Sequence, residues 1–549
     1  RGWAMEMAFP FKSLKYREGD IVQWGLNITR NIRHRNETTY LVPIPRGLGH
    51  DGKFKGGLYA ILENIRPPSH ALNMELQPYV RSGKTWIRYP DKKEDSEFDG
   101  GLDARYHITP QLTVDATWNT DFAQVESEEE VVNVTRFNIY LPEKRDFFLE
   151  NAGLFNFSMT SSAGEYYDED ADFIIFNSRT IGINDGRRTP LQGGAKIAGR
   201  AGKYSLGAMT IQSKRTGLSD GSAEPSTNFI AARLKRDLFS NSYAGLMVLN
   251  KEPGHGDWSR TAGADAYLAF TDDFYAKGSI VRTFEQNDPG RDVAGDVKVS
   301  LVKDWINVSA SYSSIDSLFN PQMGYVRRGG IRKSDGTLGF AKWINSRFLK
   351  SVSLQNTIIY TTSQADVLET REMGARAQIT ARSGDSFSFG MNRDYDFLPK
   401  EDAIRDIRID PGRYTALYQN VSVSSNGSRQ VAGSISYRWG EHLDGRSKRV
   451  SLANRTRITA HLNMDLSYTY NNLVLKNGSL SANVLAGRWT YSFTTEMFTK
   501  AYIQWNDADS RIAVNLLFDY IYSPKSHVYI VYNEIRDTGT VASRDIRDR

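Results

Sequence analysis

Apolar and polar residues alternate in short runs along most of the chain. Residues 306–313 place Ile, Val, Ala and Tyr at every second position, with Asn and Ser between them. The same pattern fills residues 431–439, 462–470 and 514–522. Successive side chains of a strand point to opposite faces, so each run predicts a strand with one apolar and one polar face.

Turn signals separate these runs. Asn426-Gly427 and Asn477-Gly478 are dipeptides that favour two-residue hairpin turns. Between about residue 72 and residue 537 the pattern predicts roughly two dozen strands of ~10 residues each, with tight turns alternating with longer polar loops. Helical periodicity is nearly absent, so the chain is predicted to be an antiparallel meander.

Two closed architectures suit such a meander. A soluble sandwich or propeller uses shorter strands and hides its apolar faces. An outer-membrane barrel needs strands of ~9–11 residues, an apolar outer face, a polar lumen and aromatic residues near the strand ends. Tyr437, Trp439, Tyr520 and Tyr522 lie at such ends. The favoured fold class is therefore all-β, a large antiparallel transmembrane β-barrel of about 24–26 strands in a Gram-negative outer membrane, in contact with lipid and lipopolysaccharide.

Composition narrows the functional classes. The 549 residues contain no cysteine, which excludes thiol catalysis and disulfide scaffolds. A net charge of +5 with scattered basic residues gives no basis for nucleic-acid binding. The eight histidines form no HExxH motif, and no GxSxG elbow, Walker loop or GxGxxG turn is present. The sequence predicts no enzyme and implies no cofactor.

Residues 1–66 form a separate part. Alternation stops at Pro10 and resumes at Val22, and Pro67-Pro68 marks the border with the barrel of residues 67–549. Two interpretations stay open: the last strands of a β-sandwich, or an N-terminal extension inside the barrel. Since Arg1 opens directly into strand-like sequence, we expect the numbering to begin inside a longer precursor.

Alternation also fails in residues 121–157, where charged residues stand directly against aromatic ones. A barrel of this size has a lumen too wide for its own side chains to fill. We expect this segment to fold inward as a plug, with its Phe and Leu residues packed on a polar lumen wall and its charges paired with wall residues. The alternative is a long solvated loop, which gains nothing from Phe147 next to Phe148. The candidate plug residues are Asp121, Gln124, Glu126, Arg136, Glu143, Lys144, Arg145, Phe147, Phe148 and Glu150.

An acidic cluster at residues 165–172 offers oxygen ligands of the kind that Ca²⁺ takes. The weak metal candidates are Asp168, Glu169, Asp170 and Asp172. The spacing lacks the Gly and the terminal bidentate Glu of an EF-hand loop, so a solvated outer loop is the favoured interpretation and no metal is predicted.

Several segments together resemble one bacterial family, DUF5916. They include GWAMEMAFPFKSL near the N-terminus, the block DFAQVE followed by EKRDFFLE, and FNPQMGYVRR from Phe319 to Arg328. The resemblance implies an N-terminal domain similar to family 9 carbohydrate-binding modules, followed by an outer-membrane barrel. It also implies a further apolar strand after the YNE segment. Either that strand follows Arg549 or the barrel closes differently.

These observations predict passage or uptake of a bulky solute across the outer membrane, gated by residues 121–157. A saccharide is the candidate ligand on the family resemblance alone. The alternative function is a non-conducting barrel that anchors a periplasmic or surface protein assembly.

Overall fold

The fold comes from a computed structural model, which describes residues 4–11, 14, 16, 21–32, 37–44, 51–54, 56–68, 73–88, 92–119, 132–133, 143–158, 172–184, 187–217, 223–239, 241–254, 256–286, 290 and 292–538.

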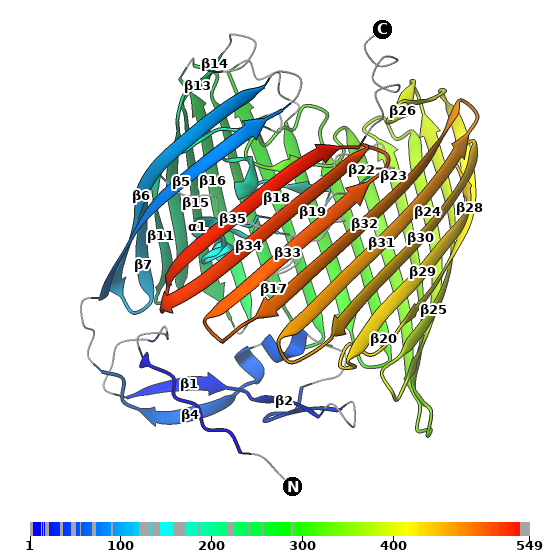
Figure 1. Cartoon of the computed structure of the whole chain (residues 1–549). Helices are drawn as coiled ribbons and strands as arrows, with labels where there is room; N and C mark the ends of the chain where they lie inside the picture. Colours follow the sequence, from blue (N-terminus) through cyan, green and yellow to red (C-terminus); the bar gives the residue numbers. More distant parts are fainter. Residues whose placement is uncertain are drawn as a thin grey trace.

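One antiparallel β-barrel of 23 strands dominates the described residues (Figure 1). Its strands in chain order are β5 (Asn73–Ile87), β6 (Lys93–Thr109), β7 (Leu112–Trp118), β11 (Leu191–Ala201), β12 (Tyr204–Ser213), β15 (Thr227–Leu238), β16 (Ser242–Pro253), β17 (Ser259–Ala269), β18 (Phe274–Glu285), β19 (Val293–Val302), β20 (Ile306–Ile315), β22 (Ile331–Trp343), β23 (Leu349–Ser363), β24 (Leu368–Ala381), β25 (Ser386–Leu398), β28 (Gly412–Ser424), β29 (Val431–His442), β30 (Gly445–Arg457), β31 (Leu462–Leu475), β32 (Gly478–Ser492), β33 (Met497–Asn506), β34 (Arg511–Ser523) and β35 (Ser526–Asp537). The all-β barrel prediction is confirmed; its count of about 24–26 strands compares with 23 in the described residues.

Shorter elements lie between these strands or before them. They are β1 (Val22–Leu26), β2 (Thr29–Ile32), β3 (Glu37–Tyr40), β4 (Ala60–Ile65), β8 (Phe173–Ile174), β9 (Ile183–Asn184), β10 (Arg187–Arg188), β13 (Thr216–Gly217), β14 (Ala223–Glu224), β21 (Tyr325–Val326), β26 (Asp402–Ile404), β27 (Ile407–Ile409), α1 (Asp146–Leu149), and the 3₁₀ turns η4 (Asp51–Phe54), η5 (Gly56–Leu58), η6 (Ala152–Phe155) and η7 (Ser178–Thr180). Within the described ranges, no helix is long and apolar enough to cross a membrane.

The alternating pattern sets the two faces of the wall. Ile435 is 59% exposed and Tyr522 61% exposed on the outer face, whereas Asp519 on the inner face of β34 is 4% exposed. An apolar face turned outward and a polar face turned inward is the arrangement that a barrel in lipid requires.

The order of strands joins β35 to β5, and this seam differs from the rest of the wall. Because the strand number is odd and every other neighbouring pair is antiparallel, β35 and β5 run in the same direction. Two of the seam contacts lie at the end that carries Lys525: Lys525 forms an ion pair with Glu75, and the Gln77 amide donates to the Lys525 carbonyl oxygen at 3.3 Å.

The two ends of the barrel differ in their connections. Tight turns such as residues 110–111, 202–203 and 524–525 lie at one end. Long connections, among them residues 119–190, 316–330 and 399–411, lie at the other. Transmembrane barrels generally carry short periplasmic turns and longer extracellular loops.

The N-terminal part lies at the tight-turn end, below the barrel in Figure 1. In it β1 pairs with β4 and β2 pairs with β3, both antiparallel. The Tyr16 ring meets the rings of Phe11 and Trp24, and its hydroxyl donates to the Pro68 carbonyl oxygen at 3.2 Å. The assignment of residues 1–66 to a carbohydrate-module-like domain stays a prediction.

Candidate functional site

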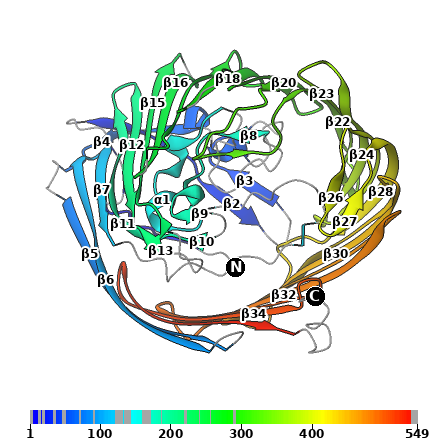
Figure 2. The same ribbon diagram turned by 90° about the horizontal axis from the view of Figure 1, so that it is seen from above.

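The connection between β7 and β11, residues 119–190, is called the inner loop. Its described parts include α1, η6, β8 and η7. Seen along the barrel axis, α1 and β8 lie inside the ring of strands (Figure 2). The connection leaves β7 and joins β11 at the end that carries the long loops, so the loop enters the lumen from that side.

An apolar cluster joins the inner loop to the lumen wall. Phe148, Phe155 and Phe157 from the loop pack with wall residues of β11 to β22, and Phe155 and Phe157 are 5% and 6% exposed. The buried members of this cluster are Phe148, Phe155, Phe157, Phe173, Ile175, Ile181, Leu191, Met209, Ile211, Phe229, Ala231, Met247, Leu249, Val281, Ala294, Ile315, Phe319, Met323 and Ile331. Burial of this apolar area stabilises the folded-in loop by roughly 25 cal/mol per Å² removed from water.

The expectation that the phenylalanines pack on a polar lumen wall is therefore wrong on this side of the lumen. The wall strands carry apolar side chains at inward positions, for example Met247 and Leu249, next to the outward Leu246 and Val248. A sequence signal for this exists, since residues 246–249 are continuously apolar rather than alternating. Continuous apolar runs are typical of strands that are buried on both faces.

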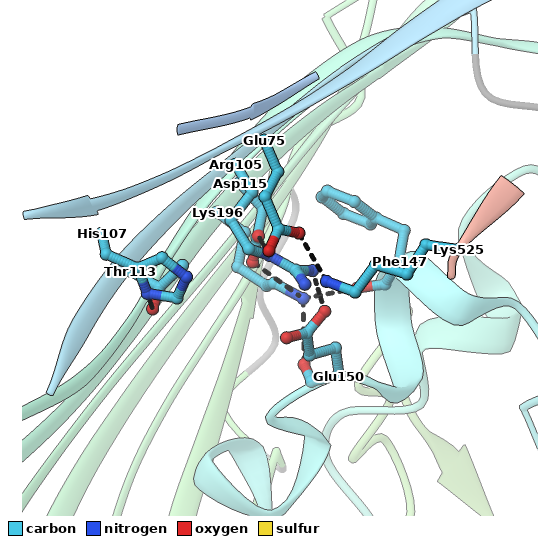
Figure 3. A network of polar contacts seen from close by, with 9 residues as sticks. All are labelled: Glu75, Arg105, His107, Thr113, Asp115, Phe147, Glu150, Lys196 and Lys525. Carbon is cyan, nitrogen blue, oxygen red and sulfur yellow. Dashed lines mark hydrogen bonds and ion pairs between the residues drawn. The ribbon is translucent and has the colours of Figure 1, made fainter. Parts of the chain in front are cut away.

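A buried lysine fixes the loop backbone to the wall (Figure 3). Lys196 on β11 donates from Nζ to the carbonyl oxygens of Phe147 and Glu150, the second at 2.9 Å. The same ammonium lies 3.7 Å from Asp115 on β7 and 4.7 Å from the centre of the Phe147 ring. Since carbonyl oxygens and a carboxylate surround it, the charge of Lys196 is fully compensated only while the loop is docked.

Arg105 on β6 extends this network to the loop side chains. Its guanidinium pairs with Asp115 at 2.6 Å and with Glu150. Figure 3 also shows the neighbouring Glu75–Lys525 pair, which belongs to the seam between β5 and β35. The predicted pairing of Glu150 with a wall residue of opposite sign is present in the structure.

A second cluster lies within the loop itself. Arg145 donates from Nη1 to the Ile181 carbonyl oxygen at 2.7 Å and from Nη2 to the Ser178 carbonyl oxygen at 2.6 Å. Its guanidinium also binds both oxygens of Glu143, at 2.7 and 2.6 Å, and lies 4.2 Å from the centre of the Phe148 ring. The expectation that Glu143 and Arg145 pair with the wall is wrong: they pair with each other and tie together two turns of the loop.

Glu143 is 7% exposed, and its environment acts on its acidity in two directions. Burial raises the pKa of this carboxyl, while the hydrogen bonds and charge of Arg145 and the hydroxyl of Ser178 lower it more. The net effect holds the pKa of Glu143 below its ordinary value of 4.5. The carboxylate is therefore charged in the folded loop at neutral pH.

Ser158, at the end of the described range 143–158, is held in place by buried charged residues of the wall. The Ser158 backbone NH donates to Asp265 at 3.0 Å, and its hydroxyl donates to Asp296 at 2.7 Å. Asp265 forms an ion pair with Arg233 at 2.7 Å, and both side chains are almost completely buried. The Phe157 ring lies 5.2 Å from the Arg233 guanidinium. Asp265, Asp296 and Arg233 were not among the residues predicted from the sequence, where their signal is a charge at a lumen-facing position of a largely uncharged strand.

Of the other predicted residues, Lys144 lies in the described part of the loop, where its backbone NH donates to Glu143 Oε1 at 3.0 Å. Asp172 is described, and its carboxylate accepts from Lys333 Nζ and from Ser313 Oγ, each at 2.9 Å. In the described part of the chain, no group of three or more His, Asp or Glu side chains is arranged to hold a metal. The remaining candidates lie outside the described residues: Asp121, Gln124, Glu126, Arg136, Asp168, Glu169 and Asp170.

Comparison with known proteins agrees with the family resemblance. Residues 70–203 match the model of a domain of unknown function, DUF5916, and this stretch contains β5 to β11 and the inner loop. No curated protein matches the sequence.

Two similar solved structures are the ferric-catecholate import receptor Fiu from E. coli K12 in its open form and the copper transporter OprC. The first has 8% identity and a TM-score of 0.34, and the match covers 61% of this chain and 66% of that one. The second has 9% identity and a TM-score of 0.32, and the match covers 61% and 65%. Both matches span less than two thirds of the solved chains.

Proposed function

We propose that this chain, in which residues 70–203 match DUF5916, is an outer-membrane barrel that passes a bulky solute and is gated by the inner loop. The observation that carries the proposal is the docking of the loop on one side of the lumen through Lys196, Ser158 and the phenylalanine cluster. A wide barrel leaks unless a segment fills it, and a docked loop supplies such an obstruction.

The docking contacts are suited to a gate. The loop and the wall meet through an apolar cluster and two separate polar anchors, Lys196 at α1 and Asp265 with Asp296 at Ser158. Displacement of the loop exposes this cluster and leaves buried charges without these partners. The closed state is therefore favoured until a solute or another protein supplies differential binding energy.

The same fold supports the proposed location. Outward apolar faces over 23 strands support insertion in a Gram-negative outer membrane, with lipid and lipopolysaccharide as its surroundings. A saccharide solute and the gating role of residues 121–157 are parts of the proposal.

The second candidate function is a non-conducting barrel that docks a periplasmic or surface assembly. The N-terminal part at the tight-turn end favours it, since the register places Leu26 on β1 and Leu62 on β4 on one face of the strand pair, and both side chains are exposed. Exposed apolar side chains gathered on one surface are typical of protein contacts.

Single-channel conductance in planar bilayers tests the two functions. The intact protein is compared with a deletion of residues 125–157 and with the double variant Lys196→Gln/Ser158→Ala, whose loop is complete but loses the Lys196 ammonium and the Ser158 hydroxyl bond to Asp296. We expect a closed intact protein and a large pore after deletion, with intermittent opening of the double variant. If all three stay silent while circular dichroism shows an intact barrel, the transport proposal is wrong and the docking function is favoured.

A further inference from the structure

Lumen-facing arginines form a row on the wall strands from β24 to β30. Arg376 pairs in register with Gly390, Gly390 with Asn420, Asn420 with Arg438, and Arg438 with Arg449. Residues paired directly across strands lie side by side on the same face of a sheet. Arg376, Arg438 and Arg449 are called the arginine row.

The register also assigns this face to the lumen. Lys333 on β22 binds Asp172 of the inner loop, so its side chain points into the barrel. The successive cross-strand pairs that start at Lys333 pass through β23 and β24 and reach Asp396 on β25. Asp396 therefore lies on the same face of the wall as Lys333. Asp396 and Gly390 lie on one strand, an even number of residues apart, and therefore share that face.

Within the described ranges, no ion pair joins the three members of the arginine row to an acidic side chain. Arg376 donates to the Ser388 hydroxyl at 3.4 Å, and Arg438 lies 5.2 Å from the Tyr418 ring centre. Asp394, on the same face of β25, acts on Arg438 through charge alone and without a hydrogen bond. Glu372 and Asp396 lie near Asp394 on the same face, so three carboxylates are close to the row but none of them forms an ion pair with its guanidinium groups.

The register adds a repulsion within the row. Arg438 and Arg449 stand directly opposite each other, and like charges in that position destabilise a sheet. Arg455, farther along β30 on the same face, instead pairs with Asp465 at 2.7 Å. An added anion at the row relieves the repulsion between Arg438 and Arg449.

A row of hydroxyl groups runs beside the arginine row. Ser388 pairs in register with Ser422, Ser422 with Ser436, Ser436 with Ser451, and Ser451 with Thr469. On each strand, the residue of the hydroxyl row lies two positions from the residue that belongs to the line of cross-strand pairs through the arginine row. Side chains two positions apart on a strand point to the same face, so the hydroxyl row also faces the lumen. The Ser388 and Ser422 hydroxyl oxygens are 2.7 Å apart.

This wall lies apart from the surface that the inner loop covers. The wall members of the apolar cluster come from β11 to β22, whereas the two rows lie on β24 to β31. The side chains of Arg438 and Arg449 are exposed to the lumen. A solute that enters the barrel therefore meets the rows without displacing the docking cluster.

We propose that the arginine row and the hydroxyl row together form a binding site for a saccharide chain that bears sulfate or carboxylate groups. Guanidinium groups bind such oxyanions through paired hydrogen bonds, and adjacent hydroxyls can donate to and accept from sugar hydroxyls. The inference rests on the proposed function and extends it by naming the chemical class of the solute. Binding to the site is measured without conduction, so each can fail independently.

The test uses the full chain in detergent and isothermal titration calorimetry with three polymers: dextran sulfate, carboxymethyl dextran and neutral dextran. The variant is Arg438→Gln/Arg449→Gln. The matched control is Arg446→Gln/Lys448→Gln, which removes the same charge from the opposite face of β30. A heat-modifiability assay confirms that each barrel is folded.

We expect at least one charged polymer to bind and neutral dextran to bind at least tenfold more weakly. The lumen variant should bind the charged polymer about tenfold more weakly, which corresponds to ~1.4 kcal/mol, and the control should stay within about twofold of the unmodified protein. The stronger of the two charged polymers identifies the oxyanion. Equal losses in the lumen variant and the control, unchanged binding in the lumen variant, or equal binding of neutral dextran overturns the proposal.

Discussion

The Lys196 ammonium on β11 lies 2.9 Å from the Glu150 carbonyl oxygen in the inner loop, and the Lys196 residue is 2% exposed. A fully buried lysine is rare unless its charge is paired. In this barrel the partners are supplied partly by the wall, through Asp115, and partly by the loop backbone. The stability of the docked loop and the solvation of this charge are therefore linked.

Replacing Lys196 with Met should loosen the inner loop while the barrel stays folded. The variant loses two charge-assisted hydrogen bonds, each worth about 1.5–3 kcal/mol, and keeps the apolar volume of the side chain. Hydrogen–deuterium exchange should be faster in residues 143–158 and unchanged in β28 to β31. Lys448→Met, on the outer face of β30, is the control. Unchanged exchange in residues 143–158 would show that Lys196 does not hold the loop.

Arg145→Lys should separate η7 from α1 although the positive charge is kept. Arg145 reaches Ser178, Ile181 and both oxygens of Glu143 through several nitrogens, and a single ammonium cannot reproduce that planar arrangement. We expect limited proteolysis to cleave residues 172–184 several times faster than in the unmodified protein. If the Arg145→Lys protein resists proteolysis as well as the unmodified protein, a positive charge at this position is sufficient and the planar guanidinium is not required.

Acid should undock this part of the loop. The folded-state pKa of Glu143 lies below its ordinary value of 4.5, so ionised Glu143 contributes stability that is fully present above that value and is lost as pH falls through the lowered pKa. Proteolytic protection of residues 143–158 should therefore fall below about pH 4.5. Glu143→Gln should be less protected at pH 7 and should show a flatter pH profile. An identical profile in both proteins would contradict the assignment to Glu143.

Asp265→Asn should be among the more destabilising single changes in the wall. It leaves the Arg233 charge buried without its carboxylate and weakens the Ser158 anchor. Loss of one partner of a buried pair costs about 3–5 kcal/mol. Thermal unfolding followed by heat-modifiable electrophoresis should show a lower midpoint. The double change Arg233→Met/Asp265→Leu should recover much of that loss, and a double variant as unstable as Asp265→Asn would argue against the unpaired-charge explanation.

Local pattern was sufficient for the strands and for their outward-facing residues. The period of two in residues 431–439 and 514–522 reflects a property of each strand alone, the alternation of side chains, and it predicts which residues face outward. Phe147 next to Phe148 likewise indicated a segment that must bury apolar surface. These inferences depend only on neighbours in the chain.

Partner choice needed the tertiary structure. Glu143 is compatible with any nearby cation, and only the fold shows that Arg145 and not the wall is its partner. Arg438 and Arg449 lie on different strands, and their juxtaposition depends on the register between β29 and β30. The direction shared by β5 and β35 likewise follows from the number of strands in the complete ring. Sequence alone therefore determined the strands and the apolar outer face, because these are local properties. The contacts of the inner loop with the wall and the lumen rows were decided by contacts between residues far apart in the chain, which single-strand patterns do not encode.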